Sequence, residues 1–372
     1  MAMRARFGVC LTLALAALLA AGASAAAARN VPRSFYGMVY DGAVRQAPLD
    51  VQRFQFAAMR RAGVESVRAV FSWAAAQPQR GGPFDFGATD ELVTLASEQR
   101  ISLLPVIIET PQWARLRPSR DASPPAHPAD YARYVRALVA RYGHGGSFWA
   151  QHPELQYQPL SYWQIWNEPH LRLYWDAARW QRGYGALLRA AHRAALAVDR
   201  RARIVLAGMT GASWDALASL YRQGRVRGAF DVAALQTYTG TALHLLHAVH
   251  LFRGVLVQHH ASRLPLWITE MGWPAAQGRI SVPSYQRTIA TTDRGMAARL
   301  KAGYALITSE RRRANALVSR VYWYTWASPY SPSRDPGTGI FRYAGLFRYD
   351  GSNFISTPSF RAYARSARQH ER

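Results

Sequence analysis

The sequence contains a single cysteine, Cys10, and it lies in an N-terminal segment that we expect to be removed. Residues 1–28 have the three parts of a secretory signal peptide: arginines at positions 4 and 6, an apolar stretch over residues 7–21, and small residues at 23–25. A mature chain without cysteine excludes disulfides, cysteine nucleophiles and thiolate metal sites. The leader predicts a secreted, extracellular protein.

Beyond residue 28, no stretch approaches the roughly 20 apolar residues of a membrane-spanning helix. Lysine is almost absent: Lys301 is the only one, although the formal net charge is +24. The arginines are dispersed, and no arginine-rich block with interleaved aromatics marks a nucleic-acid-binding face. We therefore expect no nucleic acid partner and no membrane span. The charge has two interpretations: compositional drift of a soluble surface, or affinity for an acidic or cell-envelope glycan.

Motifs of several enzyme classes are also missing. No glycine-rich phosphate loop, nucleophile elbow or zinc motif occurs in the sequence. His244, His247 and His250 recur at intervals of three, but no carboxylate or cysteine accompanies them, so a solvated helix face is favoured over a metal site. The sequence therefore predicts no metal and no cofactor.

Short apolar segments alternate with helical segments along residues 29–372, which we interpret as one domain. Eight strand-helix units favour the α/β class and a single (β/α)8 barrel, because short apolar strands separated by helices demand a parallel sheet that eight strands can close. A doubly wound open sheet is the alternative, but it would usually carry a glycine-rich phosphate turn after an early strand. The expected strands are residues 34–40, 64–71, 101–108, 161–169, 203–208, 230–238, 265–270 and 318–326; the expected helices are residues 49–62, 88–99, 129–142, 177–199, 214–223, 241–260, 285–313 and 359–368.

Two expected strands end in a glutamate. The segment at 161–169 finishes in Trp-Asn-Glu-Pro, with Glu168 before a proline, and Glu270 ends the seventh strand. In a barrel all strand C-termini share one face, so the two carboxylates can face each other across its mouth. For either glutamate alone, a structural ion pair is as good an interpretation. Together, and beside Trp166 and Trp273, they indicate a site that cleaves sugars.

At these motifs the sequence resembles clan A, the retaining glycoside hydrolases with a (β/α)8 barrel. The segment 166–169 matches the clan's acid/base signature, and the segment 268–273 is similar to its nucleophile strand. The resemblance covers nearly the whole mature chain and looks closest to bacterial members of family 39 or family 5. It implies a β-glycosidase acting on a poly- or oligosaccharide, with Glu168 as acid/base and Glu270 as nucleophile. We expect a monomer.

The resemblance also implies substrate-binding residues. Arg68 and Tyr238 match residues that contact the nucleophile, and Trp326 matches the tryptophan under the catalytic sugar. Asn167 matches the position that hydrogen-bonds the sugar 2-hydroxyl. One position departs from the pattern, because Gln236 stands where many members have histidine.

Two further tryptophans, Trp113 and Trp273, follow strands closely and are candidate sugar platforms, although packing under a loop is as good an interpretation for each. Glu109, at the end of the third strand, would be a third acid at the mouth, for binding substrate or for an ion pair.

The mechanism sets expectations for the two glutamates. The acid/base needs a raised pKa, whereas the nucleophile must stay ionised, which Arg68 and Tyr238 could ensure. A retaining pair lies about 5 to 5.5 Å apart. The alternative function is a non-catalytic barrel that binds glycan or the cell envelope, and the presence of both glutamates argues against it.

Overall fold

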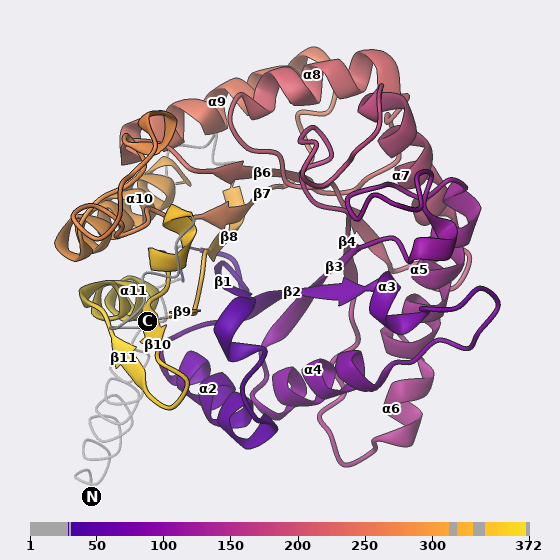
Figure 1. The fold of residues 1–372 in the computed structure, drawn as a ribbon, viewed down its shortest axis with the longest axis horizontal. Coiled ribbons are helices and arrows are strands. Elements are labelled where there is room, and N and C mark those ends of the chain that lie inside the picture. The colour runs from indigo at the N-terminus through magenta and orange to yellow at the C-terminus, as the bar shows by residue number, and fades with distance from the viewer. Residues whose placement is uncertain (1–28, 30, 312–317, 330–338, 370–372) are drawn as a thin grey trace, which may run out of the picture.

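The computed structural model describes residues 29, 31–311, 318–329 and 339–369, and its main feature is a ring of parallel strands surrounded by helices (Figure 1). The strands form a sheet in the order β5-β4-β3-β2-β1-β8-β7-β6, in which every neighbouring pair is parallel. A bridge between Val205 and Val232 links the two ends of this order. The predicted (β/α)8 barrel is confirmed.

Each expected strand overlaps one strand of the barrel. The strands are β1 (Tyr36–Tyr40), β2 (Ser66–Ser72), β3 (Ser102–Ile108), β4 (Tyr162–Ile165), β5 (Arg203–Val205), β6 (Ala233–Thr237), β7 (Leu266–Met271) and β8 (Val318–Trp323). The helices are α2 (Leu49–Arg61), α3 (Trp73–Ala76), α4 (Gly87–Glu98), α5 (Pro128–Tyr142), α6 (Ser147–Gln151), α7 (Trp180–Leu196), α8 (Ser213–Gly224), α9 (Ala242–Gln258), α10 (Asp293–Arg311) and α11 (Pro358–Arg368). Short 3-10 turns are η1 (Gly42–Val44), η2 (Gln112–Ala114), η3 (Ser284–Gln286) and η4 (Ile340–Tyr343).

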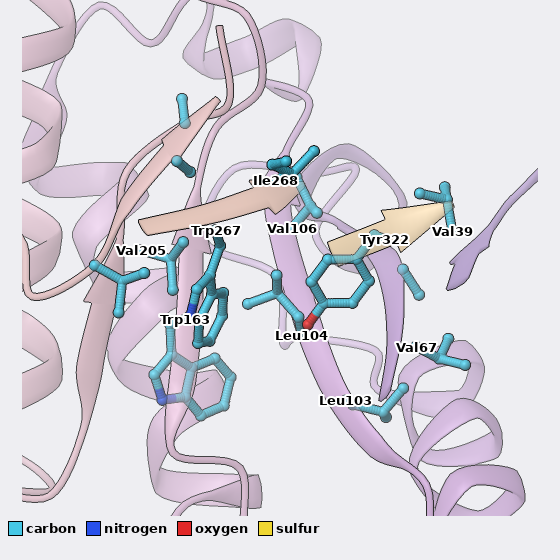
Figure 2. Packing of buried hydrophobic residues seen from close by; sticks show 14 of the residues in the cluster. Val39, Val67, Leu103, Leu104, Val106, Trp163, Val205, Trp267, Ile268 and Tyr322 are labelled. Atoms are coloured by element: carbon cyan, nitrogen blue, oxygen red, sulfur yellow. The ribbon is translucent and has the colours of Figure 1, made fainter. Parts of the chain in front are cut away.

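Large side chains fill the barrel toward the N-terminal ends of its strands (Figure 2). Trp267 of β7 and Tyr322 of β8 lie there, with ring centres 6.5 Å apart. The guanidinium of Arg320 lies 4.0 Å from the Trp267 ring centre and donates to the Tyr322 hydroxyl at 3.2 Å. That hydroxyl is 2.8 Å from the hydroxyl of Ser66, the first residue of β2. This end of the barrel is therefore packed.

The opposite end receives the predicted site residues. Glu270 is the fifth residue of β7, Asn167 and Glu168 follow β4, and Tyr238 follows β6. Arg68 lies within β2, in register with Val39 of β1 and Leu104 of β3. Because the strands are parallel, their C-terminal ends meet at one rim, and the topology brings together residues separated by up to two hundred positions.

Two boundaries predicted from the sequence are corrected. The helix expected at 285–313 begins only at Asp293, because residues 284–286 form a 3-10 turn and the Thr292 hydroxyl accepts the Gly295 N–H, as an N-cap does. The strand expected at 318–326 ends at Trp323. Residues 312 and 313, the expected end of the helix at 285–313, lie outside the described residues.

The region after β8 contains a small second sheet that the sequence did not predict. Its strands are β9 (Ala327–Pro329), β10 (Phe347–Tyr349) and β11 (Phe354–Ser356), in the order β11-β10-β9. The β10–β11 hairpin turns at Gly351, whose φ of +101° favours glycine, while the Asp350 carboxylate accepts the N–H groups of Ser352 and Asn353.

The expected signal peptide, residues 1–28, lies outside the described residues. Within the part of the chain that the structure describes, no helix is both long and apolar enough to cross a membrane.

Two helical glycines give a matched test of the packing around the barrel. A Cβ on Gly185 of α7 would lie 2.0 Å from the Gly224 carbonyl oxygen of α8, whereas a Cβ on Gly254 of α9 would meet nothing within 4 Å. Alanine at either position gains helix propensity, but only Gly185→Ala also forces two backbones apart. We expect Gly254→Ala to raise the free energy of unfolding by about 0.5–1 kcal/mol. Gly185→Ala should lower it by about 1–3 kcal/mol.

Urea unfolding of the two variants beside the wild type measures both effects. Equal changes in the two variants would contradict the close approach of α7 and α8.

Candidate active site

A cavity of about 720 Å³ opens at the C-terminal rim of the barrel strands. It contains both glutamates that the sequence singled out, Glu168 and Glu270, together with Arg68, Asn167 and Tyr238. The structure therefore brings five of the eight predicted site residues to one cavity. The remaining lining residues include Asp41, Glu109, Leu171, Leu173, Tyr174, Thr210, Tyr285, Gln286, Thr288, Ile289, Tyr324 and Phe341.

Glu270 is buried, and both of its carboxylate oxygens accept hydrogen bonds. Its Oε1 accepts from Arg68 Nη1 at 2.7 Å and from Gln236 Nε2 at 2.9 Å. Its Oε2 accepts from the Tyr238 hydroxyl at 2.5 Å. A carboxylate with one cation and two neutral donors is strongly oriented, and its ionised form is favoured.

Arg68 connects three strands through one guanidinium. Besides Glu270, its Nε donates to Gln164 of β4 at 2.7 Å and its Nη2 donates to Asn167 Oδ1 at 2.8 Å. The side chain is almost fully buried, so these bonds form away from water. The planar guanidinium thus holds β2, β4 and β7 in one alignment, and it has a separate partner on each of its three nitrogens.

Gln236 of β6, where the sequence departs from the clan pattern, belongs to the same network. Its Nε2 donates to Asn167 Oδ1 at 2.8 Å as well as to Glu270. Asn167 Oδ1 therefore accepts two hydrogen bonds, from Gln236 and from Arg68. With its oxygen fixed in this way, the Asn167 amide nitrogen is the end left to donate elsewhere.

Glu168 has a different environment from Glu270. It is buried, and none of the described residues donates a hydrogen bond to its carboxylate. The pKa of Glu168 is raised to about 8, first by burial and then by the negative charge of Glu270, while the positive charge of Arg68 acts in the opposite direction. Burial also raises the pKa of Glu270, but there the Arg68 charge and the Tyr238 hydroxyl lower it. Because Arg68, Gln236 and Tyr238 donate to Glu270, its ionised form is stabilised, and of the two carboxyl groups Glu168 is the one whose protonated form is favoured.

The backbone that presents Glu168 is unusual. Trp166 has a φ of +68° and Glu168 a φ of +41°, both in the left-handed region that non-glycine residues rarely adopt. The Glu168 N–H donates to the Gly208 carbonyl at 3.1 Å, and the Trp166 indole N–H donates to the Tyr174 carbonyl at 2.9 Å. These bonds hold the turn in place. Such strained turns are commonly found where a side chain must be aimed precisely.

Two more carboxylates line the cavity. Asp41 directly follows β1, and it accepts a hydrogen bond from the Thr325 hydroxyl at 2.8 Å. Burial raises the pKa of Asp41, and the Thr325 bond lowers it. Glu109 follows β3, and its Oε2 accepts from the Ser72 hydroxyl at 2.5 Å. Glu109 was expected at the mouth, whereas Asp41 was missed, although its position after a strand is the same signal.

The structure does not bring the three predicted tryptophans to the cavity, which corrects those expectations. The Trp326 indole N–H donates to Gln55 of α2 at 2.8 Å, and its ring packs beneath the small sheet against Phe347. Trp273 is fully buried and donates to the Thr239 carbonyl, and Trp113 donates to the Gln77 carbonyl at 2.9 Å.

Other aromatic residues line the cavity instead of these tryptophans: Tyr324, which follows β8, Tyr174, and Phe341 of η4. The Phe341 ring centre lies 4.7 Å from that of Tyr238. No group of three metal-ligating side chains able to hold an ion occurs among the described residues.

Comparison with known proteins places this geometry in context. A family model described as "Beta-galactosidase" matches residues 44–178, which include Glu168. No curated protein matches the sequence. A family 39 glycoside hydrolase from Bacteroides cellulosilyticus is 17% identical with a TM-score of 0.65, and the alignment covers 91% of this chain and 64% of that one.

Two other solved structures are similar over most of the chain. A monomeric beta-xylosidase from Caulobacter crescentus is 17% identical with a TM-score of 0.62, covering 90% of this chain and 68% of that one. A GH5_18 protein from Bifidobacterium longum, solved with Manβ1-4GlcNAc, is 15% identical with a TM-score of 0.64, covering 91% of this chain and 78% of that one. The solved structures confirm the predicted fold, and together with the family model they confirm that the chain is similar to clan A glycoside hydrolases.

Proposed function

We propose that this chain is a secreted retaining β-glycosidase that hydrolyses O-glycosidic bonds of an oligosaccharide, polysaccharide or related β-glycoside by double displacement. Glu168 is the acid/base and Glu270 the nucleophile. The observation that carries the proposal is the unequal pair of carboxylates. Glu270 accepts from Arg68, Gln236 and Tyr238, while Glu168 accepts no hydrogen bond from the described residues and has a pKa raised to about 8. A separation of about 5 to 5.5 Å between the two carboxyl groups belongs to the same proposal.

In the first step, the protonated Glu168 donates its proton to the glycosidic oxygen as the bond from that oxygen to the anomeric carbon breaks. A Glu270 oxygen attacks the same carbon from the opposite face and forms a glycosyl ester, and the leaving group departs as an alcohol. In the second step, Glu168 takes a proton from water, and the water oxygen attacks the anomeric carbon. The ester bond breaks, Glu270 returns to its carboxylate form, and the sugar leaves with its original configuration.

The electrostatics of the pair support the change of role that Glu168 must make. The negative charge of Glu270 contributes to the raised pKa of Glu168. Once Glu270 becomes an ester, that charge is gone, so the pKa of Glu168 falls and its carboxylate can serve as a base. The charge of Glu270 therefore favours the acid form of Glu168 in the first step, and the loss of that charge favours its base form in the second.

Asn167 supports the reaction through its remaining donor. Because its oxygen accepts from Arg68 and Gln236, its amide nitrogen is available to donate to the sugar 2-hydroxyl, a contact that strengthens as the transition state forms.

The charges that line the cavity favour a neutral sugar over an acidic one. Asp41 and Glu109 line it beside the catalytic pair, and Arg68 is the single cation among the described lining residues. The three nitrogens of Arg68 already have partners, so a substrate carboxylate would find no free cation there. The large positive charge of the chain therefore lies outside the described lining of the cavity, and we propose that it acts on solubility or on contact with an anionic envelope.

Export is part of the proposal because residues 1–28 carry the signal-peptide pattern, and residues 29–372 would act as one domain and as a monomer. The alternative, a barrel that binds glycan without cleaving it, is separated from the proposal by the first test below.

The first prediction concerns the two glutamates. On a panel of aryl β-glycosides and oligosaccharides, wild-type enzyme should release product that NMR at early times shows in the β configuration. Glu270→Ala and Glu168→Ala should each lower kcat by at least about 10³-fold on substrates with a poor leaving group, because each removes a group that acts on the reacting bond. Added azide should restore turnover to Glu168→Ala with retained configuration and to Glu270→Ala with inverted configuration.

Glu154→Gln is the matched control, since its carboxylate lies before β4, outside the cavity lining, and pairs with His152. It should keep wild-type activity. Inverted product from the wild type would exclude double displacement, and inactivity on the whole panel would favour the binding alternative.

The second prediction concerns pH and stability. Glu168 has a folded-state pKa of about 8 against an ordinary value of 4.5, so between these values the folded state binds a proton that the unfolded state does not. The extra proton stabilises the folded state. Its contribution to the free energy of unfolding is fully present below about pH 4.5 and is lost as pH rises through about 8. Glu168→Gln lacks the titration, so its stability relative to wild type should rise by a few kcal/mol, in order of magnitude, from about pH 5 to about pH 8.

Thermal unfolding of wild type and Glu168→Gln across this range measures the difference, with Glu154→Gln as the control. A constant difference would contradict the raised pKa.

The third prediction concerns substrate charge. The wild type should cleave a neutral aryl β-glucoside or β-galactoside more efficiently than the corresponding uronide by roughly 100-fold, because a carboxylate about 5 Å from Asp41 or Glu109 is repelled. The double variant Asp41→Asn, Glu109→Gln should lower this preference for the neutral glycoside about tenfold, because both repelling charges are removed. Initial rates on the paired substrates test it, and comparable rates on both would show that the cavity accepts acidic sugars.

A further inference from the structure

Two of the most exposed apolar side chains among the described residues line the same cavity. Leu173 is 73% exposed and Tyr285 is 80% exposed, and both belong to the cavity that holds Glu168 and Glu270. Isolated exposed leucines and tyrosines need no explanation, but apolar side chains gathered at one concave site mark a place where an apolar group binds.

The apolar surface continues inward from these two residues. Leu171, Ile289 and Phe341 also line the cavity. Phe341 packs against Tyr238, which donates to the nucleophile, so the apolar wall extends to the immediate neighbour of the reacting groups. A molecule whose sugar reaches Glu270 would therefore have apolar side chains beside the rest of its length.

Leu171 and Leu173 lie on the side of the leaving group. They belong to the same turn as Glu168: the Leu171 N–H donates to the Glu168 carbonyl at 3.0 Å, and the Tyr174 N–H donates to the Leu171 carbonyl at 3.0 Å. The acid must touch the oxygen of the leaving group in order to protonate it. The group attached to that oxygen is thus placed beside the turn that carries the two leucines.

The polar side chains at this end of the cavity are uncharged: Thr210, Gln286 and Thr288. The carboxylates Asp41 and Glu109 follow β1 and β3, whereas Leu173 and Tyr285 belong to the segments after β4 and β7. The cavity therefore has carboxylates suited to sugar hydroxyls and a separate apolar wall suited to a group without hydroxyls.

We propose that the leaving group of the natural substrate is apolar, an alkyl or aromatic alcohol, and that Leu173 and Tyr285 form its binding site. This inference rests on the proposed β-glycosidase function and names its substrate class: a glycoside of an apolar alcohol.

The test compares methyl, hexyl and benzyl β-glycosides of one sugar, prepared as both the β-glucosides and the β-galactosides. All three release an alcohol with little intrinsic leaving ability, so differences in kcat/KM chiefly report contacts to the leaving group. For the wild type, kcat/KM for the hexyl or benzyl compound should be at least about tenfold higher than kcat/KM for the methyl compound, because the larger group buries more apolar surface. The hexyl and benzyl arms distinguish a lipid-like group from an aromatic one.

Leu173→Ser and Tyr285→Ser should each reduce this advantage about fivefold, mainly through KM, because the contact is made equally in the ground state and the transition state. Cleavage of the methyl glycoside should change less than about twofold in these variants. Leu243→Ser is the matched control: that leucine is 67% exposed on α9 and does not line the cavity.

Equal efficiency on the three glycosides in the wild type would overturn the proposal, as would parallel losses on the methyl and hexyl compounds in the variants. If the wild type cleaves none of them and is also inactive on the whole aryl β-glycoside panel, the glycosidase function itself fails. Calorimetric binding of the hexyl and methyl glycosides to wild type and Leu173→Ser then still tests the apolar site, and equal affinities for the two glycosides would overturn it.

Discussion

The buried ion pair between Arg68 and Glu270 is the constraint on which the rest of the site depends. Two buried carboxylates in one cavity cannot both stay ionised at low cost, so a neighbouring group must favour the proton on one of them. The guanidinium decides it, because it lies 2.7 Å from Glu270 and has no hydrogen bond to Glu168. The same guanidinium bonds to Gln164 and Asn167, so the electrostatics of the site and the alignment of three strands are fixed by one side chain.

Much of the fold was predictable because the strands and helices of the barrel have recognisable local sequence patterns. Each strand is a short apolar run, helices such as α2, α5, α7 and α8 are amphipathic, and parallel pairing follows from the alternation of strands and helices. Glu168 and Glu270 were predictable for the same reason, since a polar residue that ends a buried strand must emerge at the rim. Asp41 also follows a strand, β1, but it was not predicted as a site residue because no recognisable motif surrounds it.

The three tryptophans that were wrongly expected in the cavity show what a local sequence pattern cannot predict. Whether an indole after a strand faces a sugar or fills the space beneath a loop depends on distant residues, such as Gln55 of α2, which accepts from Trp326. The small sheet that contacts Trp326 could not be predicted for the same reason, because β9 pairs with β10 across seventeen intervening positions. The left-handed backbone of Trp166 and Glu168 is likewise held by distant partners: the Trp166 N–H donates to Ile107 of β3, and the Glu168 N–H donates to Gly208, which follows β5.

The glutamine at position 236 has a consequence for how the site responds to its surroundings. An imidazole in this place would gain or lose a proton within the range where many extracellular environments vary, and each change would alter the charge felt by Asn167 and Glu270. An amide offers its two N–H groups at any acidity. The residues around Glu270 therefore keep a constant pattern of hydrogen-bond donors in acidic and neutral media alike, and the pH sensitivity of this network is concentrated in its carboxyl groups.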